Sequence, residues 1–150
     1  MNETNMNRLP VPTWNQCGVN TAPKAAALPE LSGDWGDANF AVTLPAGVGE
    51  SEEEFTSFTE SGMGAEADAF LLENAAVRHA LTVAENVTVA EPAVFEFTLD
   101  AAHPGTMSVL DVDAKANSSL TLVQVLRGDA ENGAAANLVR IRAAEGAHVR

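Results

Sequence analysis

An internal repeat with a period near thirty residues constrains the fold of this chain more than any other feature. Three stretches share the form strand, small polar turn, strand: Leu81–Val89, Val112–Leu122 and Ile141–Val149. Their turn residues Asn86, Asn117 and Gly146 are spaced by 31 and 29 residues. Asn and Gly tolerate the left-handed backbone that such turns need. The repeat predicts stacked coils of a β-solenoid, with a β-sandwich of short hairpins as the competing fold.

Apolar residues recur at every second position from residue 77 onward, which is the pattern of half-buried strands. They are Val77, Leu81, Val83, Phe95, Phe97, Leu99, Val139 and Ile141. Arg140 and Arg142 are therefore expected on the solvent-facing side of their strand. Alternatively, they contact an anion or a partner protein. Asp111 and Asp113 share one strand face and are likewise expected in solvent. Such a pair can also do acid–base chemistry or bind calcium, but the glycine-rich nonapeptides of calcium-binding β-helices are missing.

The first half of the chain, residues 1–74, reads as a loop-rich lead-in to a β core over residues 75–150. Five prolines interrupt helix and ladder hydrogen bonds there: Pro10, Pro12, Pro23, Pro29 and Pro45. One short helix is expected near 52–60, with Ser51 as N-cap and Glu54 at the third position of a capping box. The acidic run that follows Ser51 then lies where the helix dipole favours negative charge, so it needs no metal.

The charge balance excludes several classes of partner. The chain has 8 Lys and Arg against 21 Asp and Glu, a net charge of −13. Duplex nucleic acids and anionic membrane surfaces attract basic proteins, so neither is an expected partner. No apolar stretch reaches the roughly 20 residues of a membrane span, and no signal peptide is visible. The sequence predicts a soluble, acidic, cytoplasmic protein.

The residues that usually carry chemistry are few and scattered. Cys17 is the only cysteine, which excludes an internal disulfide and a cysteine-based zinc site. His79, His103 and His148 lack a second metal ligand at the usual spacing, and His79 is expected as a hydrogen-bonded core residue. Phosphate-loop, nucleophile-elbow and dinucleotide motifs are absent from the sequence. No catalytic, cofactor-binding or metal-binding residue is assigned, and an enzyme is not predicted.

Two parts of the sequence resemble the SufB/SufD family, the scaffold components of the SUF iron–sulfur cluster assembly system. The first is Asn7-Arg-Leu-Pro-Val-Pro-Thr-Trp-Asn15, continuing to Gly18-Val-Asn20. The second is the strand-rich repeat from about residue 75, especially Leu138–Val149, which is similar to the family's β-helix. The resemblance implies a right-handed parallel β-helix and a non-catalytic scaffold subunit. It also implies a complex in which this chain pairs with another SufB/SufD-type subunit and with a SufC-type ABC ATPase.

The same resemblance sets limits on what this chain would do. In the family, the cysteine and histidine positions tied to cluster building lie later in the chain, so none is carried over, and Cys17 matches no cluster ligand. An iron–sulfur cluster is implied only for the full complex. We expect the chain to be an N-terminal fragment of the family's fold, or a subunit whose open end a partner completes. The alternative is a generic β-solenoid or β-sandwich interaction module with no metal role.

Overall fold

The chain folds mainly into β-strands, as predicted. The structure is a computed structural model, and it describes residues 5–6, 22–23, 40–51, 55, 61, 64–128 and 134–150. The strands are β1 (Asn5–Met6), β2 (Ala22–Pro23), β3 (Phe40–Thr43), β4 (Val48–Glu50), β5 (Val77–Val83), β6 (Ala93–Leu99), β7 (Gly105–Ala114), β8 (Ser119–Leu120), β9 (Leu122–Gly128), β10 (Ala134–Ala143) and β11 (His148–Val149). One described helix, α2 (Ala65–Asn74), precedes β5.

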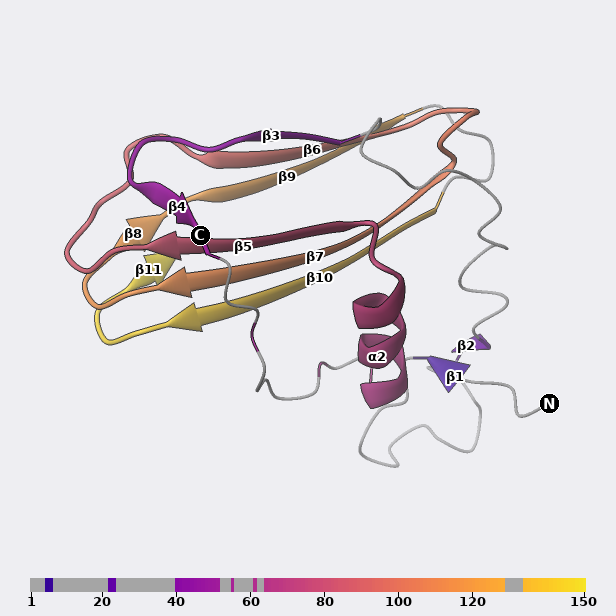
Figure 1. The fold of residues 1–150 in the computed structure, drawn as a ribbon, viewed down its shortest axis with the longest axis horizontal. Helices are drawn as coiled ribbons and strands as arrows, with labels where there is room; N and C mark the ends of the chain where they lie inside the picture. Colours follow the sequence, from indigo (N-terminus) through magenta and orange to yellow (C-terminus); the bar gives the residue numbers. More distant parts are fainter. Residues whose placement is uncertain are drawn as a thin grey trace.

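Two sheets lie face to face along the length of the molecule (Figure 1). One has the strand order β10-β7-β5-β4 and the other the order β3-β6-β9, while β8 and β11 form a small two-stranded sheet. The chain runs from a strand of the first sheet, through a turn, to a strand of the second, and then returns. Strands that follow one another in the repeat therefore become parallel neighbours, instead of the antiparallel hairpins of the competing fold.

The strand register reproduces the repeat seen in the sequence. Each residue of β5 lies beside the residue of β7 that is 31 positions later, and β7 and β10 are offset by 29. The turns stack as well: Asn86, Asn117 and Gly146 have φ angles of 62°, 54° and 69°. The Nδ2 of Asn117 donates to the Oδ1 of Asn86 at 3.2 Å. The predicted left-handed turns are confirmed.

The space between the two sheets is filled by the alternating apolar residues. The buried cluster draws on both sheets: Val77, Leu81, Val83, Val89, Ala93, Phe95, Phe97, Leu110, Val112 and Leu120. The apolar faces predicted for β5 and β6 are confirmed by the burial of these residues. This cluster defines the inner face of each sheet, and the side of the four-stranded sheet turned away from it is called here the outer face.

The two ends of the strand stack differ. At one end, β3 pairs with β6 and β4 with β5, both antiparallel, so a reversed pair of strands covers the first repeat. We call this the sealed end. At the other end, β9 and β10 are edge strands, and no further described strand pairs with them. We call the edges of β9, β10 and β11 the open end.

Apolar side chains become exposed at the open end. Ile141 is 41% exposed although its register partner Val112 is fully buried, and Leu126 is 54% exposed beside the buried Phe97. Ile141 was expected in the interior, and that prediction is wrong because, among the described residues, no strand lies beyond β10 to cover it. Val42 on β3, at the sealed end, is exposed to 37%.

The lead-in region contributes more to the core than the sequence indicates. Strands β3 and β4 and helix α2 all lie within residues 1–74, where mostly loops were expected. Within the expected helix near 52–60 the structure describes only Phe55, which belongs to no helix or strand; the rest lies outside the described residues. Cys17 and the Asn7–Asn20 motif are outside them too. No described helix has the length and apolar character needed to cross a membrane.

Candidate functional site

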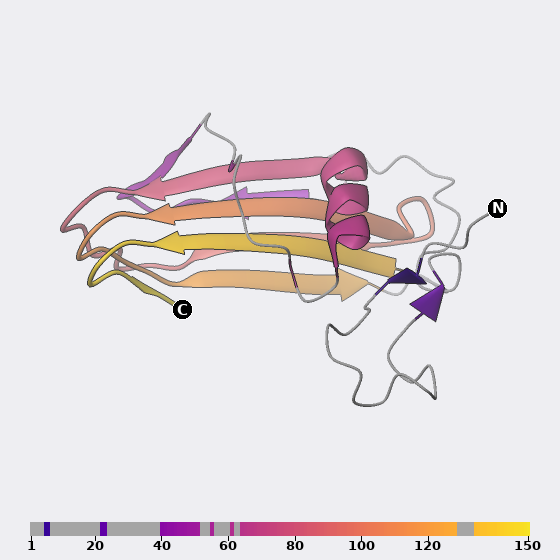
Figure 2. The same cartoon turned by 90° about the horizontal axis from the view of Figure 1, so that it is seen from below.

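The outer face of the four-stranded sheet carries the most elaborate arrangement of side chains in the described residues. Helix α2 lies across it (Figure 2) and buries Leu71 against Met107 and Val109 of β7 and Leu138 of β10. Ala-, Leu- and Glu-rich sequence favours a helix here. The Oδ2 of Asp68 accepts from the backbone N–H of Ser61 at 2.7 Å, which ties the helix to the preceding segment. This apolar cluster covers one half of the outer face.

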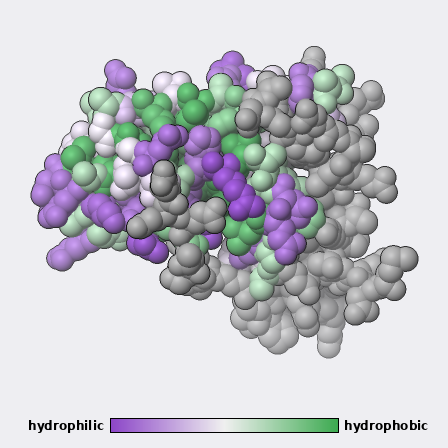
Figure 3. All heavy atoms as spheres, in the orientation of Figure 1, coloured by the Kyte–Doolittle hydropathy of each residue, from purple (hydrophilic) through white to green (hydrophobic). Residues whose placement is uncertain are grey.

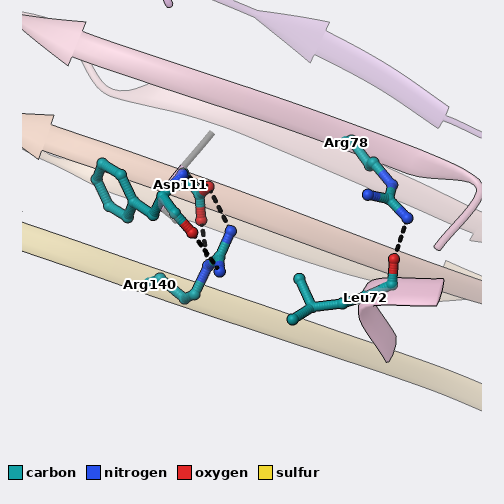
Figure 4. A network of polar contacts seen from close by, with 5 residues as sticks. Leu72, Arg78, Asp111 and Arg140 are labelled. Atoms are coloured by element: carbon teal, nitrogen blue, oxygen red, sulfur yellow. Dashed lines mark hydrogen bonds and ion pairs between the residues drawn. The ribbon is translucent and has the colours of Figure 1, made fainter. Parts of the chain in front are cut away.

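A buried ion pair occupies the other half. Asp111 on β7 and Arg140 on β10 are register partners on adjacent strands. The Nε and Nη2 of Arg140 donate to the two carboxylate oxygens of Asp111, each at 2.6 Å (Figure 4). Asp111 is 3% exposed and Arg140 is 8% exposed. The prediction that both residues face solvent is wrong, because Phe55 lies against the pair and Leu72 of α2 lies beside it.

The ion pair holds one residue of the lead-in by its backbone. The N–H of Phe55 donates to Asp111 Oδ2 at 3.2 Å, and the carbonyl of Phe55 accepts from Arg140 Nη1 at 3.1 Å. The guanidinium carbon of Arg142 lies 4.4 Å from the centre of the Phe55 ring. Arg142 therefore contacts an aromatic face, and Phe55 itself is 8% exposed. Asp111, Arg140, Arg142 and Phe55 are called the clamp below.

A small cavity lies beside the clamp. Its volume is about 150 Å³, and its lining residues are Ser51, Leu72, Arg78, His79, Ala80, Val109, Asp111 and Arg140. Ala80 of β5 is the register partner of Asp111 of β7. Its small side chain leaves space beside the longer side chains of Asp111 and of Arg140 on β10. Arg78 donates to the carbonyl of Leu72 near the C-terminus of α2, where a cation is favourable. Two guanidinium groups and one carboxylate thus line the cavity.

Of the other polar residues singled out from the sequence, His79 lines the cavity, whereas His148 and Asp113 do not. His79 is partly buried, with its Nδ1 3.4 Å from Glu50 Oε1 and its ring 5.2 Å from that of Phe40. His148 is exposed near the end of β11. Asp113 pairs with Lys115 at 2.7 Å. Within the part of the chain that the structure describes, no group of three or more His, Cys, Asp or Glu could hold a metal ion.

Asp100 and His103 form a separate turn between β6 and β7. The Oδ1 of Asp100 accepts from the backbone N–H of His103 at 2.7 Å and of Ala102 at 2.8 Å. These bonds, that of His103 above all, lower the pKa of the Asp100 carboxyl below its ordinary value of 3.8, because they stabilise its charged form. His103 Nδ1 lies 3.1 Å from the same oxygen.

Hydrophilic residues gather at the end of the molecule that carries the stacked turns (Figure 3). Apolar residues lie over the middle of the same view.

The clamp was missed from the sequence, although the repeat contained a signal for it. Asp111 and Arg140 are 29 residues apart, which is the spacing of the turn residues Asn117 and Gly146. Opposite charges one period apart in stacked parallel strands lie side by side, so the pair could have been predicted from the repeat. Ser108 and Asn137 have the same spacing, and the Oγ of Ser108 donates to the Oδ1 of Asn137 at 2.8 Å. No sequence signal indicated that Phe55 would contact Asp111 and Arg140.

The chemistry available at the clamp is recognition of a peptide group. The Asp111 carboxylate accepts three hydrogen bonds, two from Arg140 and one from Phe55, and a carboxylate held in this way serves as an acceptor. Comparison of the chain with protein-family models, with curated proteins and with solved structures gives no match.

Proposed function

We propose that this protein is a non-catalytic scaffold subunit of the SUF iron–sulfur cluster assembly machinery, similar to SufB and SufD. The observation that carries the proposal is a pairing of two features. The motif Leu9-Pro-Val-Pro-Thr-Trp14 stands ahead of a repeat whose parallel strands stack one period apart. A scaffold of this kind needs surfaces for other subunits and no catalytic constellation of its own.

The finer fold belongs to the same proposal. Strands stacked in parallel at offsets of 29 and 31 residues support the first coils of a parallel β-helix. Crossovers between parallel strands of one sheet are right-handed in nearly all proteins, so we infer a right-handed helix. The acidic charge suits a cytoplasmic protein that works without nucleic acids or membranes.

The open end supports a subunit partner. An edge strand presents N–H and C=O groups to which another chain can add a strand. Leu126 and Ile141 add exposed apolar surface to that edge. We infer that a SufB/SufD-type subunit, either a second copy or a related chain, pairs there, and that a SufC-type ATPase joins the complex. An iron–sulfur cluster would belong to the complex, because this chain offers no assigned ligand.

Co-expression tests this function. The tagged chain is produced with the SufC-type ATPase and the SufB-type subunit of its own organism, and the products are separated by size-exclusion chromatography. We expect a complex that contains all three chains. Deletion of the gene should also lower the activity of iron–sulfur enzymes in the cell, and the full gene should restore it.

A pair of matched variants locates the subunit contact. Leu126→Glu combined with Ile141→Glu places charge on the open end and should release the SufB-type subunit. Val42→Glu places one such charge at the sealed end and should leave the complex intact. If no complex forms and iron–sulfur enzyme activities are unchanged after deletion, the protein is a general interaction module and the scaffold proposal is wrong.

A further inference from the structure

The free edge of β10 continues a row of side chains that the two neighbouring strands begin. Val77 of β5, Ser108 of β7 and Asn137 of β10 are register partners and lie one beside the next across the sheet. The row is on the inner face, because Ser108 alternates along β7 with Leu110 and Val112 of the buried cluster. It becomes more polar toward the open end, where Asn137 is exposed.

Strand β10 shows what an added strand does to its neighbour. The inner-face residues of β7 that β10 covers are at most 2% exposed: Ser108, Leu110 and Val112. On β10 itself, Asn137 is exposed, Val139 is half-buried and Ile141 is 41% exposed. A further strand on the free edge of β10 would bury these three residues in the same way.

Asn137 sets a chemical condition on that strand. Its Oδ1 accepts from the Oγ of Ser108 at 2.8 Å, and its Nδ2 has no hydrogen-bond partner among the residues that the structure describes. Burying this amide group beside an apolar side chain would cost its desolvation without a hydrogen bond in return. A Ser, Thr, Asn or Gln side chain on the added strand would supply that bond. A single buried asparagine fixes the register of coiled coils in the same way.

Arg142 sets a second condition, on the outer face. It is exposed, and within the described part of the chain its guanidinium contacts the ring of Phe55 and no carboxylate. On the covered edge of β10, Asp113 of β7 is its register partner. An acidic residue at the matching position of an added strand would pair with this charge, because opposite charges on neighbouring strands attract.

We propose that Asn137 selects the strand that joins the free edge of β10. The strand runs parallel to β10, as β7 and β5 do, and carries Ser, Thr, Asn or Gln beside Asn137. Apolar residues follow two and four positions later, beside Val139 and Ile141, and an acidic residue lies beside Arg142. The selection rests on the proposed function in one respect, that a partner subunit joins the open end, and it adds which strand that subunit contributes.

Peptide binding to the full chain tests the proposal. The probe is a fluorescent peptide with the sequence of residues 105–114, Gly-Thr-Met-Ser-Val-Leu-Asp-Val-Asp-Ala, which meets each condition in the register of β7. The control peptide has valine in place of its serine. The wild-type chain should bind the probe saturably and the control about tenfold more weakly, because only the serine satisfies the Asn137 amide. Equal binding of the two peptides, or no binding of the probe, would overturn the proposal.

Variants of the chain assign the preference to Asn137. Asn137→Val should reverse it, so that the control peptide binds more tightly than the probe. Arg142→Ala should weaken both peptides about threefold, whereas Arg127→Ala on β9 should change neither. If Asn137→Val does not fold, Asn137→Ala replaces it and should bind the two peptides equally. A preference for the probe that persists in either variant would overturn the proposal.

The direction of the bound strand is measured with a nitroxide at the N-terminus of the probe. A parallel strand should broaden the amide signals of Ala134 and Ala136 and leave those of Arg142 and Ala143 sharp; the opposite pattern would overturn the proposal. None of these measurements contains a SUF component. Loss of the co-expressed complex alone would contradict the scaffold function, whereas equal binding of the two peptides would contradict the selection by Asn137.

Discussion

Arg140 and Asp111 carry opposite charges one repeat period apart, and the fold buries both beneath the lead-in. Removing one partner of such a pair leaves an uncompensated buried charge, which costs about 3–5 kcal/mol. We therefore expect Arg140→Met to lower the free energy of unfolding by about 3–5 kcal/mol, as measured by urea denaturation. The double variant Asp111→Leu with Arg140→Met should recover most of that loss, because neither charge remains.

The control for this prediction is the exposed ion pair between Lys115 and Asp113. The side chain of Lys115 is 53% exposed, and such pairs contribute about 1 kcal/mol or less. Lys115→Met should therefore change the stability little. Equal losses in Arg140→Met and Lys115→Met would contradict the assignment of a buried pair.

The Asp100 carboxylate makes the stability of the fold depend on pH. Its pKa is lowered in the folded protein, chiefly by the backbone N–H of His103, so its negative charge stabilises the fold at pH values above 3.8. That contribution is lost as the pH falls below 3.8 through the lower folded-state value. A carbon-detected NMR titration should place the Asp100 midpoint below 3.8. His103→Gln, which keeps the backbone N–H, should preserve most of the lowering; a midpoint at or above 3.8 in the wild-type chain would contradict it.

At the scale of the element, the stacked left-handed turns constrain which residue can occupy position 146. Gly146 has a φ angle of +69°, and a Cβ at this position would lie 2.5 Å from the Oδ1 of Asn117. Gly146→Ala should therefore destabilise the protein by about 1–3 kcal/mol, through backbone strain and displacement of the Asn117 side chain. Thermal unfolding measures this. Gly49→Ala is the comparison, because its Cβ would meet Thr82 Cγ2 at 3.3 Å and the Thr82 carbonyl oxygen at an ordinary 3.8 Å. An equal or smaller effect at Gly146 would contradict a left-handed stacked turn.

The elements that could be predicted from the sequence are those determined by local pattern. Alternation placed Phe95 and Phe97 in the interior, and Asn86 marked a left-handed turn, because both signals lie within a few residues. The exposure of Ile141 and the burial of Arg140 could not be predicted in this way. Each depends on what covers a strand from outside it: nothing at the open end, and α2 with Phe55 on the outer face.

At the scale of the whole molecule, the two ends of the stack differ in strand direction: antiparallel pairs form one end and parallel pairs the other. The reversed strands β3 and β4 cover the first repeat and are themselves the edge strands at that end. The open end has no such cover among the described residues.

Hydrogen exchange of the β9 amides, read residue by residue, tests most directly whether the open end of a stacked-strand scaffold receives another subunit. The N–H of Leu122 already donates to the carbonyl of Arg150, so the amides of Gln124 and Leu126 face the same open side. They should exchange quickly in the isolated chain and become protected when the SufB-type subunit is added, whereas the amides of β7 should be protected in both states. Fast exchange of Gln124 and Leu126 that is unchanged by the added subunit would contradict the account.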